Sequence, residues 1–176
     1  MNPVTPRLSW RFMARHPAHW LALGAGSGLS PVAPGTAGTL WAWAVFVLLN
    51  RWLTPLQWGM VIAVSLPLGW WACTITARHL ARPDPSAVVW DEIVAFWIVL
   101  WLVMPAGWGM QLVAFALFRY FDAAKPGPVG WADGLFKGRG PEVGWAQGWG
   151  ILFDDLVAAG CTLLVIALGQ TLLGTL

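Results

Sequence analysis

Charged residues are scarce in this chain of 176 residues: Asp, Glu, Lys and Arg make up 10% of it, against roughly 25% in an average soluble protein. The net charge is only +2, and no basic run is interleaved with aromatics, so nucleic-acid binding is excluded. Cysteine is also rare. Cys73 and Cys161 lie inside apolar segments without metal-ligand or redox spacing, which favours buried thiols that act as small hydrophobes.

Apolar and aromatic residues are abundant instead. The chain is 58% hydrophobic, has a mean hydropathy of +0.64 and contains 15 tryptophans. Indole rings favour the headgroup layer of a bilayer, where the ring is half buried and its N–H stays hydrated. The composition therefore predicts an integral membrane protein whose surroundings include the lipid bilayer.

Long apolar runs separated by Pro and Gly predict an all-α fold, a polytopic membrane helical bundle of about four to five apolar helices. About 20 residues are needed to cross the hydrocarbon core, so the first and third runs, of about 15 to 17 residues, are marginal spans. A kink is expected at Pro67 and Gly69. The runs cover residues 39–53, 58–80, 88–104, the segment from the PAGWG turn to 121, and 151–173.

Alternating passes through a membrane sort the charges by side. Only Arg51 of the ten basic residues falls on the far side, so the positive-inside rule makes the other side cytoplasmic. All eight acids fall on that cytoplasmic side too, which the rule does not require. Residues 1–19 form a basic arm, with Arg7, Arg11 and Arg15 four residues apart, that is predicted to lie on the membrane surface. Residues 20–176 form one membrane-embedded domain, with a Gly/Pro-rich cytoplasmic loop at 125–150.

Two acidic pairs, Asp91 with Glu92 and Asp154 with Asp155, are each expected to open a helix. Capping is the simpler explanation, because an acid in the first turn gains roughly 0.3–1 kcal/mol from the helix dipole. One acid suffices for a cap, however, and an acid in apolar surroundings is costly. Two adjacent acids are therefore more than capping needs.

Asp122 falls at the C-terminal end of a predicted helix, where the dipole disfavours an anion. It needs a cation, and Arg119 and Lys125 are each three residues away. A plain salt bridge is one explanation. The other is a phosphate site, since Arg offers a planar fork of donors and Lys a point charge.

The five acids come from three helix ends on one predicted side of the membrane, which resembles the ligand set of Mg²⁺. Neighbouring helical residues point about 100° apart, so one member of a pair could bind metal while the other acts as a base. The expected metal ligands and catalytic residues are Asp91, Glu92, Asp122, Asp154 and Asp155. Together with Arg119 and Lys125 they predict chemistry on a phosphorylated lipid headgroup.

The stretch GSGLSPVAPGTAGT, residues 26–39, carries no charge and no aromatic residue. A flexible entry loop would explain its glycines but not its two prolines, which stiffen a chain. With Thr36 or Thr39 as N-cap, the following free N–H groups could receive an anion, and the Ser27 and Thr36 hydroxyls could add donors. This stretch is therefore a candidate wall of the phosphate site.

The motifs GSGLSPVAPGTAGT, VVWDEIVAFW, FRYFDAAKPGPV and FDDLVAAG, in this order, resemble those of the phosphatidylglycerophosphatase A family. The resemblance implies a Mg²⁺-dependent phosphatase of the bacterial inner (cytoplasmic) membrane, multi-pass, with its active site facing the cytoplasm. It implies hydrolysis of phosphatidylglycerol phosphate to phosphatidylglycerol and inorganic phosphate, in phospholipid biosynthesis. Between KPGP and FDD the family is usually shorter and rich in Gly-Gly, whereas this chain has a longer segment, so the resemblance assigns no role to Asp133, Lys137 and Arg139. The positions that match are Ser27, Thr36, Asp91, Glu92, Arg119, Asp122, Lys125, Asp154 and Asp155.

Several alternatives stay open at this stage. Attack by a metal-activated water and a covalent aspartyl-phosphate are both compatible with the residues. The spacing of a CDP-alcohol phosphotransferase is absent, and no histidine has the company that vanadium-sensitive lipid phosphatases require. A small membrane cation transporter is the rival from another class, although transport sites usually lie near the membrane midplane. Oligomeric state is not predicted.

Overall fold

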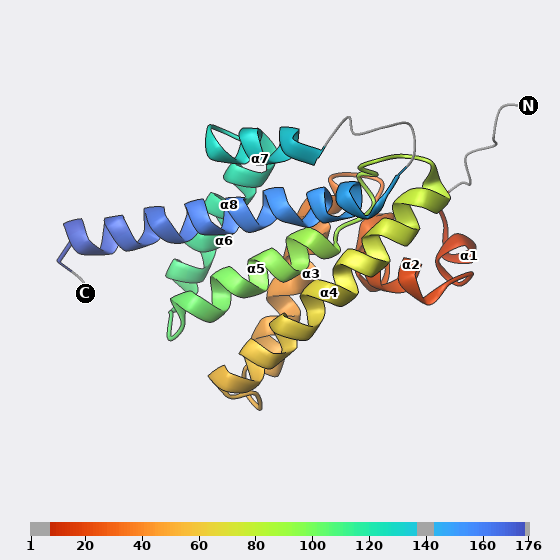
Figure 1. The fold of residues 1–176 in the computed structure, drawn as a ribbon. Coiled ribbons are helices and arrows are strands. Elements are labelled where there is room, and N and C mark those ends of the chain that lie inside the picture. Colours follow the sequence, from red (N-terminus) through yellow and green to blue (C-terminus); the bar gives the residue numbers. More distant parts are fainter. Residues whose placement is uncertain (1–7, 137–142, 175–176) are drawn as a thin grey trace, which may run out of the picture.

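The computed structural model describes residues 8–136 and 143–174, and this part of the chain is helical without strands (Figure 1). The all-α expectation is therefore confirmed for the described residues. In chain order the elements are α1 Trp10–Met13, α2 Pro17–Ala22, the 3₁₀ helix η1 Gly24–Leu29, α3 Pro34–Leu49, α4 Pro55–Leu80, α5 Trp90–Val103, α6 Trp108–Ala124, α7 Pro128–Phe136 and α8 Trp145–Leu172.

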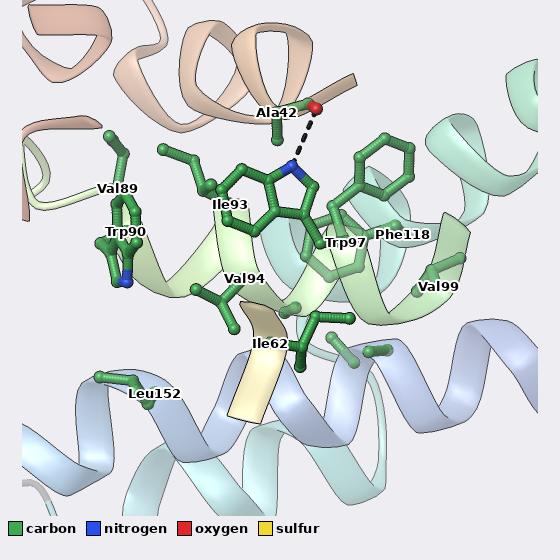
Figure 2. Packing of buried hydrophobic residues seen from close by; sticks show 14 of the residues in the cluster. Ala42, Ile62, Val89, Trp90, Ile93, Val94, Trp97, Val99, Phe118 and Leu152 are labelled. Carbon is green, nitrogen blue, oxygen red and sulfur yellow. Dashed lines mark hydrogen bonds between the residues drawn. The ribbon is translucent and has the colours of Figure 1, made fainter. Parts of the chain in front are cut away.

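Helix α5 is the centre of the core, with α3, α4, α6 and α8 packed around it (Figure 2). Its Ile93, Val94 and Phe96 are fully buried, and each such side chain contributes roughly 1.5–3 kcal/mol relative to exposure. Trp97 also donates its indole N–H to the Ala42 carbonyl of α3, at 2.9 Å. The site residues at the start of α5 are thus carried on the most tightly surrounded helix.

Each of the five apolar runs forms a helix. Within the described residues, α4 and α8 are the two that are long and apolar enough to cross a membrane by length and composition, and α3 is apolar but only 16 residues long. Helix α4 runs on through Pro67, and Gly69 lets Trp90 of α5 approach closely, because an added Cβ would lie 2.4 Å from its ring.

The first of these helices begins earlier than predicted. Its N-cap is Ala33, in the left-handed region at φ 46°, and Pro34 opens the first turn, where its fixed φ suits a helix and its missing N–H costs nothing. The expectation that Thr36 or Thr39 is the N-cap is wrong. Thr39 lies inside the helix and donates its hydroxyl to the Gly35 carbonyl.

The expected loop at 125–150 is also largely helical, since it contains α7 and the first turns of α8. Asp154 and Asp155 therefore lie in the third turn of α8 and do not open it. Glycine content suggested a loop, but Gly148 serves close packing here: an added Cβ would lie 1.8 Å from Thr74 Oγ1 of α4. Lys137, Arg139, Glu142 and Arg7 lie outside the described residues.

This close approach gives a test of the α4–α8 contact. In Gly148→Ala the new methyl would also lie 3.0 Å from the backbone Cα of Thr74, so the helices must separate, and we expect a loss of about 1–3 kcal/mol. Gly160→Ala on the same helix is the matched control. Nothing lies within 4 Å of its added Cβ, so a small gain of about 0.5–1 kcal/mol is expected. Thermal unfolding in detergent would measure both, and equal stability of the two variants would contradict the packing.

The three histidines meet where α2 packs against the end of α4. His19 Nδ1 lies 2.9 Å from the Phe12 carbonyl, and its Nε2 lies 2.8 Å from His79 Nδ1. Neutral His19 therefore donates to Phe12 and accepts from His79. Burial lowers the pKa of His19, despite the opposing hydrogen bond to Phe12. His16 lies beside both rings.

Candidate active site

A cavity of about 260 Å³ lies where the N-terminal ends of α3 and α5, the C-terminal end of α6 and the third turn of α8 meet. The chain folds so that these four regions, far apart in sequence, contribute charged groups to one hollow. The predicted residues that line it are Asp91, Glu92, Arg119, Asp122, Lys125, Asp154 and Asp155.

Three of these acids, Asp91, Glu92 and Asp155, form what we call the carboxylate cluster. One oxygen from each lies within 4.8 Å of the others. Asp91 Oδ1, Glu92 Oε2 and Asp155 Oδ2 are buried, and none has a hydrogen-bond partner among the described residues. Buried carboxylate oxygens without partners are costly unless a cation compensates them. Three hard oxygen donors this close together fit a divalent cation.

Arg119 connects this cluster to the end of α6. Its Nη1 contacts Asp122 Oδ2, as the spacing of three residues predicts, and lies 3.8 Å from Glu92 Oε1. The same nitrogen donates to Thr39 Oγ1 of α3, at 3.4 Å. The guanidinium is therefore held by three elements at the edge of the carboxylate cluster.

Lys125 pairs differently from the prediction. Its ammonium donates to Asp133 of α7, at 2.6 Å, and to Asp154 of α8, and it makes no such contact with Asp122. Burial lowers the pKa of Lys125, but these two hydrogen bonds outweigh burial and leave the pKa above its usual value. Lys125 therefore keeps its positive charge. Asp133, to which the sequence assigned no role, is its partner on α7.

The glycine-rich stretch reaches the cavity through its last part. Ala33, Pro34 and Gly35 line it, and the first N–H groups of α3 have no partners within their helix. An added Cβ on Gly35 would lie 2.2 Å from Glu92 Oε1 and 3.2 Å from Arg119 Nη1. Only a glycine leaves both side chains where they are.

Two predicted residues are not brought into the site. Ser27 and Thr36 are not among the residues that line the cavity, and Ser27 donates its hydroxyl to the Gly24 carbonyl within η1, at 2.9 Å. Their assignment as phosphate-binding residues gains no support from this geometry. The residues of this stretch that line the cavity are Ala33, Pro34 and Gly35, and none of them carries a hydroxyl group.

Sequence reasoning missed other contributors. Thr39 contacts Arg119, Asp133 contacts Lys125, and Asp84 and Ser86 line the cavity from the exposed segment before α5. Thr39 could have been found from its sequence position, because it lies one helical turn after Gly35 and therefore on the same face of α3. Asp84 could have been found from the two prolines beside it, because they restrict the backbone and hold this acid in one place.

Comparison with known proteins agrees with the four motifs. The sequence model of the phosphatidylglycerophosphatase A family matches residues 20–170. The chain is 35% identical to phosphatidylglycerophosphatase A of Escherichia coli over 151 residues, 84% of this chain and 80% of that protein. It is 36% identical to the Haemophilus influenzae protein of the same name over 151 residues, 86% and 87% of the two chains.

A third relative carries a different name. The putative phosphatidylinositol-3-phosphatase of Bacteroides thetaiotaomicron is 37% identical over 161 residues, 88% of this chain and 94% of that protein. No solved structure matches the chain. The helical fold and its acidic, cation-lined cavity thus belong to an enzyme of the lipid phosphatase class. The chain belongs to the phosphatidylglycerophosphatase A family.

Proposed function

We propose that this enzyme hydrolyses the phosphomonoester of phosphatidylglycerol phosphate, releasing phosphatidylglycerol and inorganic phosphate. The observation that carries the proposal is the carboxylate cluster beside Arg119 and Lys125 in one cavity. A phosphomonoester needs cationic donors for its oxygens, and Arg119 and Lys125 provide them. The choice of phosphatidylglycerol phosphate as the substrate is supported by the two relatives named phosphatidylglycerophosphatase A.

Asp91, Glu92 and Asp155 would hold the Mg²⁺ ion. Asp122 and Asp154 line the same cavity but are paired with Arg119 and Lys125. When bound, the ion would neutralise phosphate charge and acidify a coordinated water. Arg119 and Lys125 would turn from Asp122 and Asp154 to the phosphoryl oxygens and stabilise the charge on them.

A carboxylate released from its cation is then a base placed beside the reacting phosphorus. Asp122 and Asp154 are the candidates, because each is paired with a cation that would turn to the phosphate. Direct attack by one carboxylate, with an aspartyl-phosphate intermediate, remains the alternative route. Trapping with acid and labelled substrate would separate them, since only the second leaves label on the protein.

We also propose that the chain is a multi-pass protein of the bacterial inner membrane with its cavity on the cytoplasmic side. Large apolar side chains are exposed along α4 and α8, for example Val64 and Leu168, and the end of α8 projects beyond the other helices (Figure 1). Soluble monomers rarely expose such stretches. On the basic arm, exposed Trp10 beside Arg11 suits the membrane surface.

The test is phosphate release by the purified protein from phosphatidylglycerol phosphate in mixed micelles, with Mg²⁺ and with excess EDTA. We expect turnover only with the metal, restored when Mg²⁺ is added back. Phosphatidylinositol 3-phosphate is the comparison substrate, because one relative is named for it. Faster release from the inositol lipid would overturn the substrate assignment, and release in EDTA would overturn the metal site.

A further inference from the structure

A second hollow lies away from the catalytic cavity, along the outer face of α3. It has a volume of about 460 Å³ and is lined by Leu40, Trp43, Ala44, Val47, Leu48, Arg51 and Trp108. We call it the α3 groove. Its α3 residues recur every three or four positions, so they form one stripe on the helix. All its lining residues are apolar except Arg51.

Arg51 makes this groove more than an apolar strip. It follows the C-terminal end of α3, while Gly35 at the other end of that helix lines the catalytic cavity, about 24 Å away at 1.5 Å per residue. The described acids line that cavity or, in the case of Asp133, contact Lys125. Arg51 therefore makes no ion pair with a described residue. An unpaired guanidinium at the end of an apolar groove is complementary to an anion attached to a hydrocarbon chain.

The dimensions agree with one lipid. The groove follows α3 from Leu40 to Leu48 for about 12 Å, with Arg51 about one turn further, and one leaflet of a bilayer is about 15 Å deep. Trp108, 67% exposed, lies at the rim, and tryptophan is typical of the headgroup level.

We propose that the α3 groove binds an anionic phospholipid of the leaflet opposite the catalytic cavity, with its phosphate on Arg51 and one acyl chain along Ala44 and Val47. The inference rests on the membrane placement proposed above, but not on the phosphatase activity. A zwitterionic lipid would bring an ammonium group to an end of the molecule where the described residues offer no carboxylate. A net negative headgroup is therefore preferred.

The experiment is native mass spectrometry of the purified full chain released from uncharged detergent micelles. Phosphatidylglycerol or phosphatidylethanolamine with identical acyl chains is added, with EDTA present to remove metal from the catalytic site, and the Arg51→Gln comparison separates the α3 groove from the catalytic cavity. We expect one retained phosphatidylglycerol, bound about tenfold more weakly in Arg51→Gln. Arg11→Gln, which removes an exposed cation from α1, is the matched control and should retain the lipid.

Ala44→Trp fills the groove without removing charge and faces outward, so it should fold and lose the lipid as well. Equal retention of the two lipids, or no effect of Arg51→Gln, would overturn the proposal. It would also be overturned if the spectra showed a second copy of the chain that Ala44→Trp displaces. A chain without phosphatase activity would still give the expected binding, so the two proposals fail separately.

Discussion

Asp155→Asn is expected to reduce phosphate release on the order of 10²–10³-fold, while making the metal-free protein more stable. Asp155 is 3% exposed and supplies one of the three unpartnered carboxylate oxygens. Without a cation these oxygens repel one another in a poorly solvated place, so replacing one charge by an amide relieves the folded state. The same change removes a ligand from the proposed Mg²⁺ site.

The opposite signs of the two effects make this prediction informative. A carboxylate with a purely structural role would lose stability when neutralised. We would measure the thermal midpoint in EDTA and in Mg²⁺, together with turnover: the wild-type chain should gain stability from Mg²⁺, and Asp155→Asn should gain much less. Asp84→Asn makes the same chemical change at the exposed rim of the cavity and should have a much smaller effect on both. Normal turnover by Asp155→Asn would remove the carboxylate cluster as the site.

Gly35→Ala is expected to lower turnover by about two orders of magnitude without unfolding the protein, because misplacing reacting groups by about 1 Å can cost that much. The new methyl would lie 2.2 Å from Glu92 Oε1, the end of a side chain that can move away. The fold therefore survives, whereas the carboxylate cluster and its approach to Arg119 do not.

Gly109→Ala is a closely matched control for this substitution. Gly35 and Gly109 are the second residues of α3 and α6, helices of 16 and 17 residues, and nothing lies within 4 Å of a Cβ at Gly109. Both variants should be folded in detergent, and only Gly35→Ala should lose activity. Equal activity of the two would show that the start of α3 does not shape the site.

The sequence predicts the helices well because they depend on strong local signals. Apolar runs ended by Pro and Gly place α4, α5 and α6 within a few residues, and the pairing of Asp122 with Arg119 follows from helical spacing alone. Asp154 and Asp155 could not be placed in a third turn, because the glycines before them are ordinarily loop residues. The helix that carries these two acids, α8, packs against α4 through the contact of Gly148 with Thr74, a residue about 75 positions earlier in the chain.

Ion pairs between residues on different helices could not be predicted from sequence spacing either. Nothing in the spacing of Lys125 distinguishes Asp122 from Asp154, since the choice depends on how α6 and α8 cross. Ser27 and Thr36 were predicted by residue type, yet the residues of that stretch that line the cavity are Ala33, Pro34 and Gly35. The sequence shows that Ser27 and Thr36 carry hydroxyl groups, but it does not show whether their helices direct these groups toward the cavity.

The segment before α3 is more than a basic arm for a membrane. The backbone N–H of Val89, the N-cap of the helix that carries Asp91 and Glu92, donates to the Ala22 carbonyl at 2.9 Å. The segment before α3 therefore satisfies this N–H. Phe12 and Met13 of the same segment are buried in one cluster with Leu80 and Ala87. A shortened form of the enzyme that starts at α3 would keep every charged group of the cavity. It would lose the hydrogen bond from Val89 to Ala22, which holds the start of the helix that carries Asp91 and Glu92.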